Sequence, residues 1–321
     1  MVALLIKKCR NDKHKKMKTP YLSLNPFIPW MKEKHPIEWH RKFGRSAEFE
    51  IEIGFGLGNF LVQQALAHPK KDFLGIELGW VQIRRTLRKI ALAGVKNVRV
   101  IQADAQVAFE RIFLEKSFAS VYALFPCPWP KKKHVKYRLF SHAFLKLINS
   151  RIMDKGQILI VTDSRFYFDW ILSQLAGTGF EVCSEMVSPR FSTKYERKWY
   201  ALGQRTFYEL RVIKCRHMKI PLKEDVNLIT YRVDSFDPEG FKPSNGRGHL
   251  MVEFKEVLYD PKREKGMVRS VVGEDSLIQD FWIEIVKQEK SWHIRPARGC
   301  NIIPTAGIQR ALDLVYNATN R

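Results

Sequence analysis

Residues 50–58 of the chain, EIEIGFGLG, decide its fold. The alternation from Glu50 to Ile53 predicts a buried strand, three glycines then form a turn, and residues 59–67 have the apolar spacing of a helix. A strand, a glycine turn and a helix start leave bare backbone against which a ligand can lie. The stretch therefore predicts a ligand site in an α/β domain, with an ordinary tight turn as the alternative.

The glycine spacing and a nearby acid indicate the kind of ligand. The turn reads G-x-G-x-G at Gly54, Gly56 and Gly58, whereas a dinucleotide site reads G-x-G-x-x-G so that a pyrophosphate can approach the amides. Glu52 lies two residues before the first glycine, where a carboxylate would repel a pyrophosphate and pair with an ammonium group. S-adenosyl-L-methionine has an amine, a sulfonium and no phosphate, so the sequence favours it as the ligand.

Two further acids follow strand-like runs. Glu77 ends the run at 72–77, where a carboxylate can bridge both hydroxyls of a ribose. Asp104 follows the run at 98–101, where it can face an adenine amino group. Because the carboxyl ends of parallel strands share one rim of a sheet, the acids together predict an adenosyl pocket. Its expected residues are Glu52, Gly54, Gly56, Gly58, Glu77, Asp104 and Ala105.

Composition limits the partners and the compartment. The 55 basic and 33 acidic side chains give a formal charge of +22, which points to a polyanion such as RNA, DNA or an acidic membrane surface. The five cysteines are scattered without a C-x-x-C pair, which argues against a zinc ribbon and a disulfide framework. No apolar run approaches membrane-spanning length. We expect a soluble, cytoplasmic protein without a metal or a membrane partner.

Residues 1–45 form a basic and aromatic N-terminal segment. They contain 12 Lys or Arg against three acids, and aromatic residues such as Tyr21, Phe27 and Trp30 are interleaved with them. Such a segment can be an arm that neutralises phosphates and stacks on unpaired bases. A solvated, partly disordered leader is the equal alternative.

From residue 46 the chain alternates between strand and helix patterns. After the first three strands, further ones are predicted at 118–124, 157–162, 180–184 and 206–213, with helices at 80–93 and about 165–176. Five alternating units and two late strands predict a seven-stranded α/β sheet closed by an antiparallel hairpin, the Rossmann-like methyltransferase fold, over residues 46–215. The outer face of 80–93 carries Arg84, Arg85, Arg88 and Lys89, and we assign it to solvent.

The stretch FPCPWPKKKHVKYRLF, residues 125–140, follows the fourth strand. Its three prolines predict a stiff loop at the rim, and basic residues from Lys131 to Arg138 follow without an acid. Such a loop can place a base and hold its phosphate. Asp163 follows the fifth strand on the same rim.

Together, EIGFGLG, FLGIE, NVRVIQADA, FPCPWPKKKH, TDS and STKYER resemble the bacterial tRNA (guanine-N7)-methyltransferase family over residues 48–213. This family transfers a methyl group to N7 of a guanine in the variable loop of tRNA. The resemblance implies that Glu52, Glu77 and Asp104 bind S-adenosyl-L-methionine. It also implies tRNA contacts by Lys131, Asp163, Thr193, Lys194, Tyr195 and Glu196.

One position departs from the family. The family's loop reads F-P-D-P-W, and its aspartate is the proposed catalytic residue, but this chain has Cys127 there. A thiol cannot reproduce the bond of a carboxylate to a guanine edge. Because guanine N7 already has a lone pair, the reaction needs no base, and we expect activity to survive with Asp163 as the nearest substitute. A covalent role for Cys127 as a nucleophile is the lesser alternative.

Residues 216–321 lie outside the resemblance. Strand-like runs at 226–233, 250–259, 266–272 and 280–287 precede a helix near 308–317, which predicts a small α+β appendage. Its role stays open, with an extension of the tRNA contact by exposed Lys, Arg and Trp as one option. The main prediction is a tRNA methyltransferase. The alternatives are a tRNA-binding homologue or partner subunit impaired by Cys127, and an enzyme that methylates another nucleic acid or a protein. Monomer and homodimer both stay open, as does the choice of tRNA.

Overall fold

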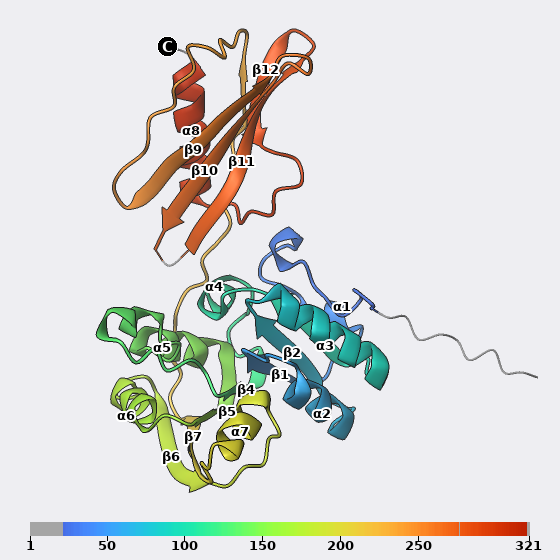
Figure 1. Ribbon diagram of the computed structural model, residues 1–321, viewed down its shortest axis with the longest axis vertical. Coiled ribbons are helices and arrows are strands. Elements are labelled where there is room, and N and C mark those ends of the chain that lie inside the picture. The colour runs from blue at the N-terminus through green and yellow to red at the C-terminus, as the bar shows by residue number, and fades with distance from the viewer. Residues whose placement is uncertain (1–21, 276, 320–321) are drawn as a thin grey trace, which may run out of the picture.

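The computed structural model describes residues 22–275 and 277–319, and it contains two separate sheets (Figure 1). The first has seven strands in the order β3-β2-β1-β4-β5-β7-β6. All neighbours pair in parallel except β7, which runs antiparallel between β5 and β6. This confirms the predicted Rossmann-like methyltransferase sheet with its antiparallel closure. The strands are β1 (Phe49–Ile53), β2 (Asp72–Glu77), β3 (Val98–Gln102), β4 (Phe118–Leu124), β5 (Ile152–Thr162), β6 (Phe180–Val187) and β7 (Phe207–Lys214).

Helices cross between these strands. They are α2 (Asn59–Ala67), α3 (Trp80–Ala93), α4 (Ala105–Arg111), α5 (His142–Arg151), α6 (Arg165–Gln174) and α7 (Lys194–Ala201). The sequence predicted a loop where α7 lies, because this helix buries only Glu196 and so lacks an apolar stripe. Its signal was the capping box, in which Thr193 is followed three residues later by Glu196.

The described part of the N-terminal segment packs on the first sheet. It includes η1 (Trp30–Lys32) and α1 (Trp39–Phe43), and the Trp30 and Trp39 side chains are 3% and 7% exposed. The Trp30 indole donates a hydrogen bond to the Gln102 carbonyl, 2.7 Å away. The expectation that the aromatics of this segment stack on bases is therefore wrong for Trp30, which belongs to the core, where Trp39 is buried as well. Residues 1–21 lie outside the described residues.

The second sheet is antiparallel and has the order β8-β12-β11-β10-β9. One helix, α8 (Ala306–Thr319), packs on it and buries Ile308, Leu312 and Val315 against core residues such as Val268 and Ile283. A C-terminal α+β unit is therefore present as predicted, although the sequence missed the short strand β12. The strands are β8 (Tyr231–Val233), β9 (Leu250–Asp260), β10 (Lys265–Glu274), β11 (Leu277–Gln288) and β12 (Ser291–Pro296). The boundaries after residues 45 and 215 stay predictions.

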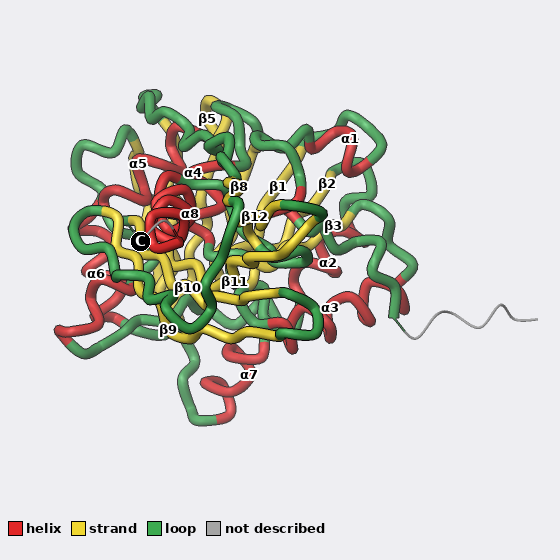
Figure 2. The backbone as a smooth tube through the Cα atoms, turned by 90° about the horizontal axis from the view of Figure 1, so that it is seen from above, coloured by secondary structure: helices red, strands yellow, loops and turns green. Residues whose placement is uncertain are grey.

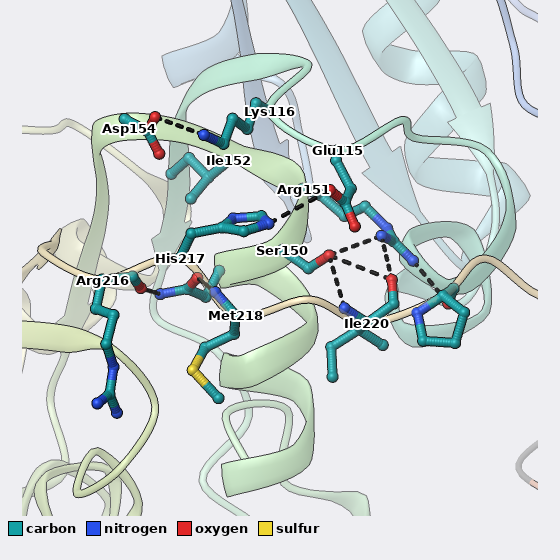
Figure 3. A network of polar contacts seen from close by, with 12 residues as sticks. Glu115, Lys116, Ser150, Arg151, Ile152, Asp154, Arg216, His217, Met218 and Ile220 are labelled. Atoms are coloured by element: carbon teal, nitrogen blue, oxygen red, sulfur yellow. Dashed lines mark hydrogen bonds and ion pairs between the residues drawn. The ribbon is translucent and has the colours of Figure 1, made fainter.

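The segment between the two sheets is fixed to the end of α5 (Figure 3). The fully buried Arg151 donates hydrogen bonds to the carbonyls of Ile220, at 2.7 Å, and Pro221, at 3.1 Å. Asn149 accepts a hydrogen bond from the Met218 amide at 2.8 Å. Since Arg151 directly precedes β5, the second sheet is attached at the amino ends of the parallel strands, on the side opposite their carboxyl rim. From above, the second sheet lies over the first domain and α7 lies at the periphery (Figure 2).

Candidate active site

The three predicted acids lie at the carboxyl ends of three neighbouring strands. Glu52 is in β1 and pairs in register with Gly75 of β2. Glu77 ends β2 and pairs with Gln102 of β3, two residues before Asp104. The structure thus brings all three to one rim of the first sheet.

The glycine turn has a backbone that other residues rarely adopt. Gly54, Gly56 and Gly58 have φ angles of 71°, 53° and 64°. A Cβ at Gly58 would also overlap the Thr86 side chain of α3. The left-handed conformation favours glycine at all three positions, and at Gly58 the close packing of α2 on α3 requires it as well.

Glu52 has an unusual environment. Its side chain is 4% exposed, and its Oε2 atom has no hydrogen-bond partner among the described residues. Burial, reinforced by the charge of Glu77, raises the pKa of Glu52 to about 8. A buried carboxyl with an open oxygen beside bare glycine backbone is suited to a cationic ligand.

The other two acids, Glu77 and Asp104, lie at the rim and also accept hydrogen bonds from backbone amides. Glu77 accepts hydrogen bonds from the amides of Gly56 (3.0 Å), Leu78 (2.9 Å) and Gly79 (3.1 Å). Asp104 is the N-cap of α4, and its Oδ1 atom accepts from the amides of Gln106 and Val107. The exposed Asp104 keeps its Oδ2 atom available, and Ala105 begins the helix behind it.

The proline loop after β4 is held by Arg138, a residue that the sequence analysis treated only as one more cation. This guanidinium is 5% exposed and donates to the carbonyls of Pro128 and Trp129, each at 3.1 Å. It also lies over the rings of Phe166 and Trp170 of α6, at 4.6 and 5.0 Å. Trp129 has a φ angle of 42°, so Arg138 supports a strained turn. Cys127 and Lys131, on either side of this turn, are both exposed.

The remaining predicted residues lie near α7. Asp163 follows β5, and burial raises the pKa of its carboxyl. Thr193 is the N-cap of α7 and accepts from the Glu196 amide at 3.1 Å. The Glu196 carboxylate is 3% exposed and accepts from the backbone amides of residues 190, 191 and 192. Glu196 therefore shapes the loop, whereas the neighbouring Lys194 and Tyr195 face solvent.

The start of α7 is linked to the glycine turn. Asn59, the first residue of α2, donates from Nδ2 to the Ser192 carbonyl at 3.3 Å. Thus the segment 192–196 lies beside the same turn that carries the predicted ligand site, although it is more than 130 residues away in sequence.

The family model described as "putative methyltransferase" matches residues 46–209. The tRNA (guanine-N(7)-)-methyltransferase of Thermotoga maritima is 35% identical over 287 residues, which cover 87% of this chain and 91% of that protein. This chain belongs to the bacterial tRNA (guanine-N7)-methyltransferase family. The family's Aquifex aeolicus protein is 27% identical and covers 90% of this chain and 97% of its own, so the similarity extends into the second sheet.

Other matches cover little more than half of this chain. The protein of Chlorobium phaeobacteroides with the same name is 42% identical over 170 residues, which cover 53% of this chain and 83% of that protein. The solved 16S rRNA (adenine(1408)-N(1))-methyltransferase from Catenulisporales acidiphilia has a TM-score of 0.42 and 17% identity, covering 57% of this chain and 94% of that one.

Within residues 22–275 and 277–319, no helix is long and apolar enough to cross a membrane. No cluster of three or more His, Cys, Asp or Glu side chains in this part of the chain has the arrangement to hold a metal ion.

Proposed function

We propose that this protein methylates N7 of a guanine in the variable loop of tRNA, with S-adenosyl-L-methionine as the methyl donor. The observation that carries the proposal is the buried Glu52 carboxyl, which has an open oxygen beside the glycine turn in a member of this family. The relatives named above are tRNA (guanine-N(7)-)-methyltransferases. A tRNA substrate also implies a cytoplasmic location.

The residues at the rim fit the donor. When bound, S-adenosyl-L-methionine supplies a methyl group on a positively charged sulfur. Glu52 would pair with its ammonium group, Glu77 would accept from the ribose hydroxyls, and Asp104 would accept from the adenine amino group through Oδ2. Gly54 and Gly56 would let the ligand approach the backbone, since a Cβ is absent at both positions.

The chain's main task in the reaction is positioning. The bound donor would supply the methyl group and keep the electron pair of its carbon–sulfur bond, and guanine N7 would accept the methyl group with its own lone pair, so the chain would not have to remove a proton. The protein must hold the nitrogen in line and stabilise the guanine as it becomes cationic. Asp163 would supply a negative charge for this step, and Cys127 occupies the position from which the family's aspartate acts.

Several exposed residues would hold the RNA. Lys131 follows the proline loop and would contact a phosphate, while Lys194 and Tyr195 project from the first turn of α7. Thr193 and Glu196 are engaged in capping that helix, so they would contribute to binding by fixing the loop at 190–193.

The direct test is incubation of the purified protein with labelled S-adenosyl-L-methionine and unmodified tRNA, followed by nucleoside analysis. We expect label in 7-methylguanosine at a single position of the tRNA. Binding of tRNA and donor without any methyl transfer would instead favour the second candidate, a binding protein impaired by Cys127. Label in another nucleoside or in protein would contradict both.

A further inference from the structure

The outer face of α3 carries two exposed arginines, Arg84 and Arg85, without an acidic partner among the described residues. Its inner face buries Ile83, Leu87 and Ile90, and the helix WVQIRRTLRKIALA contains no Asp or Glu. Arg84 and Arg85 are exposed, and within residues 22–275 and 277–319 no carboxylate forms an ion pair with either. A helix face that is merely solvated usually mixes both signs of charge. Because α3 contains no acid at all, this helix face differs from an ordinary solvent-exposed face and is a candidate surface for an anionic partner.

A second cation reaches this face from α7. Lys89 of α3 donates from Nζ to the Leu57 carbonyl at 2.7 Å and also contacts the Asn59 side chain. Burial, and then the charge of Arg197, lower the pKa of Lys89. Arg197 is exposed and has no carboxylate partner in the described part of the chain. Asn59 in turn donates to the Ser192 carbonyl just before α7, so Lys89 and the start of α7 lie on either side of this asparagine, with the charges of Lys89 and Arg197 within electrostatic reach.

In the second sheet several cations form ion pairs, as Arg269 does with Asp280 at 2.7 Å and Lys265 does with Glu284 at 2.7 Å. Residues 216–321 contain 17 basic and 15 acidic side chains, so they contribute little to the charge of +22. Residues 46–215 contain 26 basic and 15 acidic side chains. In this domain α2 and α7 lie at the end of the molecule opposite the second sheet (Figure 1).

We propose that the outer face of α3, together with Lys89 beside the glycine turn and Arg197 of α7, binds the phosphate backbone of the RNA substrate. The sequence alone assigned this face to solvent. Gathering like charges destabilises the folded chain, and RNA phosphates offset this repulsion while releasing their counterions. Because Lys89 contacts the glycine turn itself, a backbone held on this face would be continuous with the donor site. The identity of the RNA as tRNA rests on the proposed function.

The test is the salt dependence of tRNA binding for the double variant Arg85→Gln, Arg197→Gln. Both side chains are exposed, and Lys89 is left in place because it supports the turn. Each phosphate contact contributes about 0.7 to 0.9 to the slope of log affinity against log salt. We therefore expect the slope to fall by about 1.5, while the donor affinity measured by calorimetry stays unchanged. The control is Lys262→Gln, Lys290→Gln, which removes two exposed cations from turns of the second sheet and should leave the slope as in wild type.

Three results would overturn the proposal. One is a wild-type slope in the double variant. Another is an equal fall in the control, which would show that general charge alone binds RNA. The third is weaker donor binding with unchanged tRNA binding, which would mean that Arg197 serves the carboxylate of the donor. The slope is measured without turnover, so its outcome is separate from whether 7-methylguanosine is formed.

Discussion

At the scale of single residues, the buried carboxyl of Glu52 costs stability that a ligand can recover. Its pKa is raised from 4.5 to about 8, so the native state binds more protons than the unfolded state between these values. Stability in the absence of donor should therefore fall as the pH rises through this window. Glu52→Gln removes the charge, so we expect a higher melting temperature than wild type at pH 8 to 9 but not at pH 4.5, together with weaker donor binding. Thermal unfolding across pH measures this, and equal pH profiles for both proteins would refute it.

Cys127 gives a second prediction at this scale. A carboxylate at this exposed position would orient the guanine and stabilise its developing charge, as in the family's loop. Cys127→Asp should therefore raise the rate of methyl transfer, by up to about 10²-fold, and Cys127→Ser should leave it near wild type. Single-turnover assays with saturating donor measure the step. No gain in Cys127→Asp over wild type would contradict this prediction, and a rate for Cys127→Ser well below wild type would show that the thiol itself is needed.

At the scale of elements, the proline loop depends on α6 through Arg138. The guanidinium joins two loop carbonyls to two aromatic rings, and lysine keeps the charge but lacks the planar fork. We expect Arg138→Lys to lower kcat by about 10- to 100-fold, since small displacements of reacting groups are costly, with donor affinity unchanged. An exposed matched control is Lys136→Arg, which should retain full activity. If Arg138→Lys changes only the melting temperature, the loop is not positioned by this contact.

At the scale of the whole molecule, the first domain depends on the segment that leads to the second sheet. Removing residues after 215 would deprive the buried Arg151 of the Ile220 and Pro221 carbonyls. Two hydrogen bonds to a charged group are worth about 3 to 6 kcal/mol, so the shortened chain should unfold at a much lower temperature. Adding Arg151→Met to the shortened chain should recover part of this loss. No recovery would mean that the guanidinium is not the cause, and an unchanged melting temperature would mean that the segment is dispensable.

The sequence predicted the features that depend on local pattern. The strands, the glycine turn and the acids at the rim follow from alternation and spacing within a few residues, as EIEIGFGLG illustrates. Burial of Trp30 could not be predicted, because its partner Gln102 is 72 residues away. Similarly, the sequence gives no sign that Arg138 and Arg151 are buried. Their burial depends on backbone carbonyls that only the folded chain places around each guanidinium. The sequence shows that basic residues outnumber acidic ones. Only the structure shows which of these basic side chains form ion pairs and which, such as Arg84 and Arg85, have no acidic partner among the described residues.

If Glu52 receives the cationic donor, the Glu52 carboxyl should release its proton when the donor binds, and this proton release can be measured. With a pKa of about 8, Glu52 is mostly protonated at pH 7, and the ammonium of the donor would draw the pKa down. Calorimetry of S-adenosyl-L-methionine binding at pH 7, in buffers with different ionisation enthalpies, should show release of about one proton. A binding heat that is independent of the buffer, or no binding at all, would contradict the account.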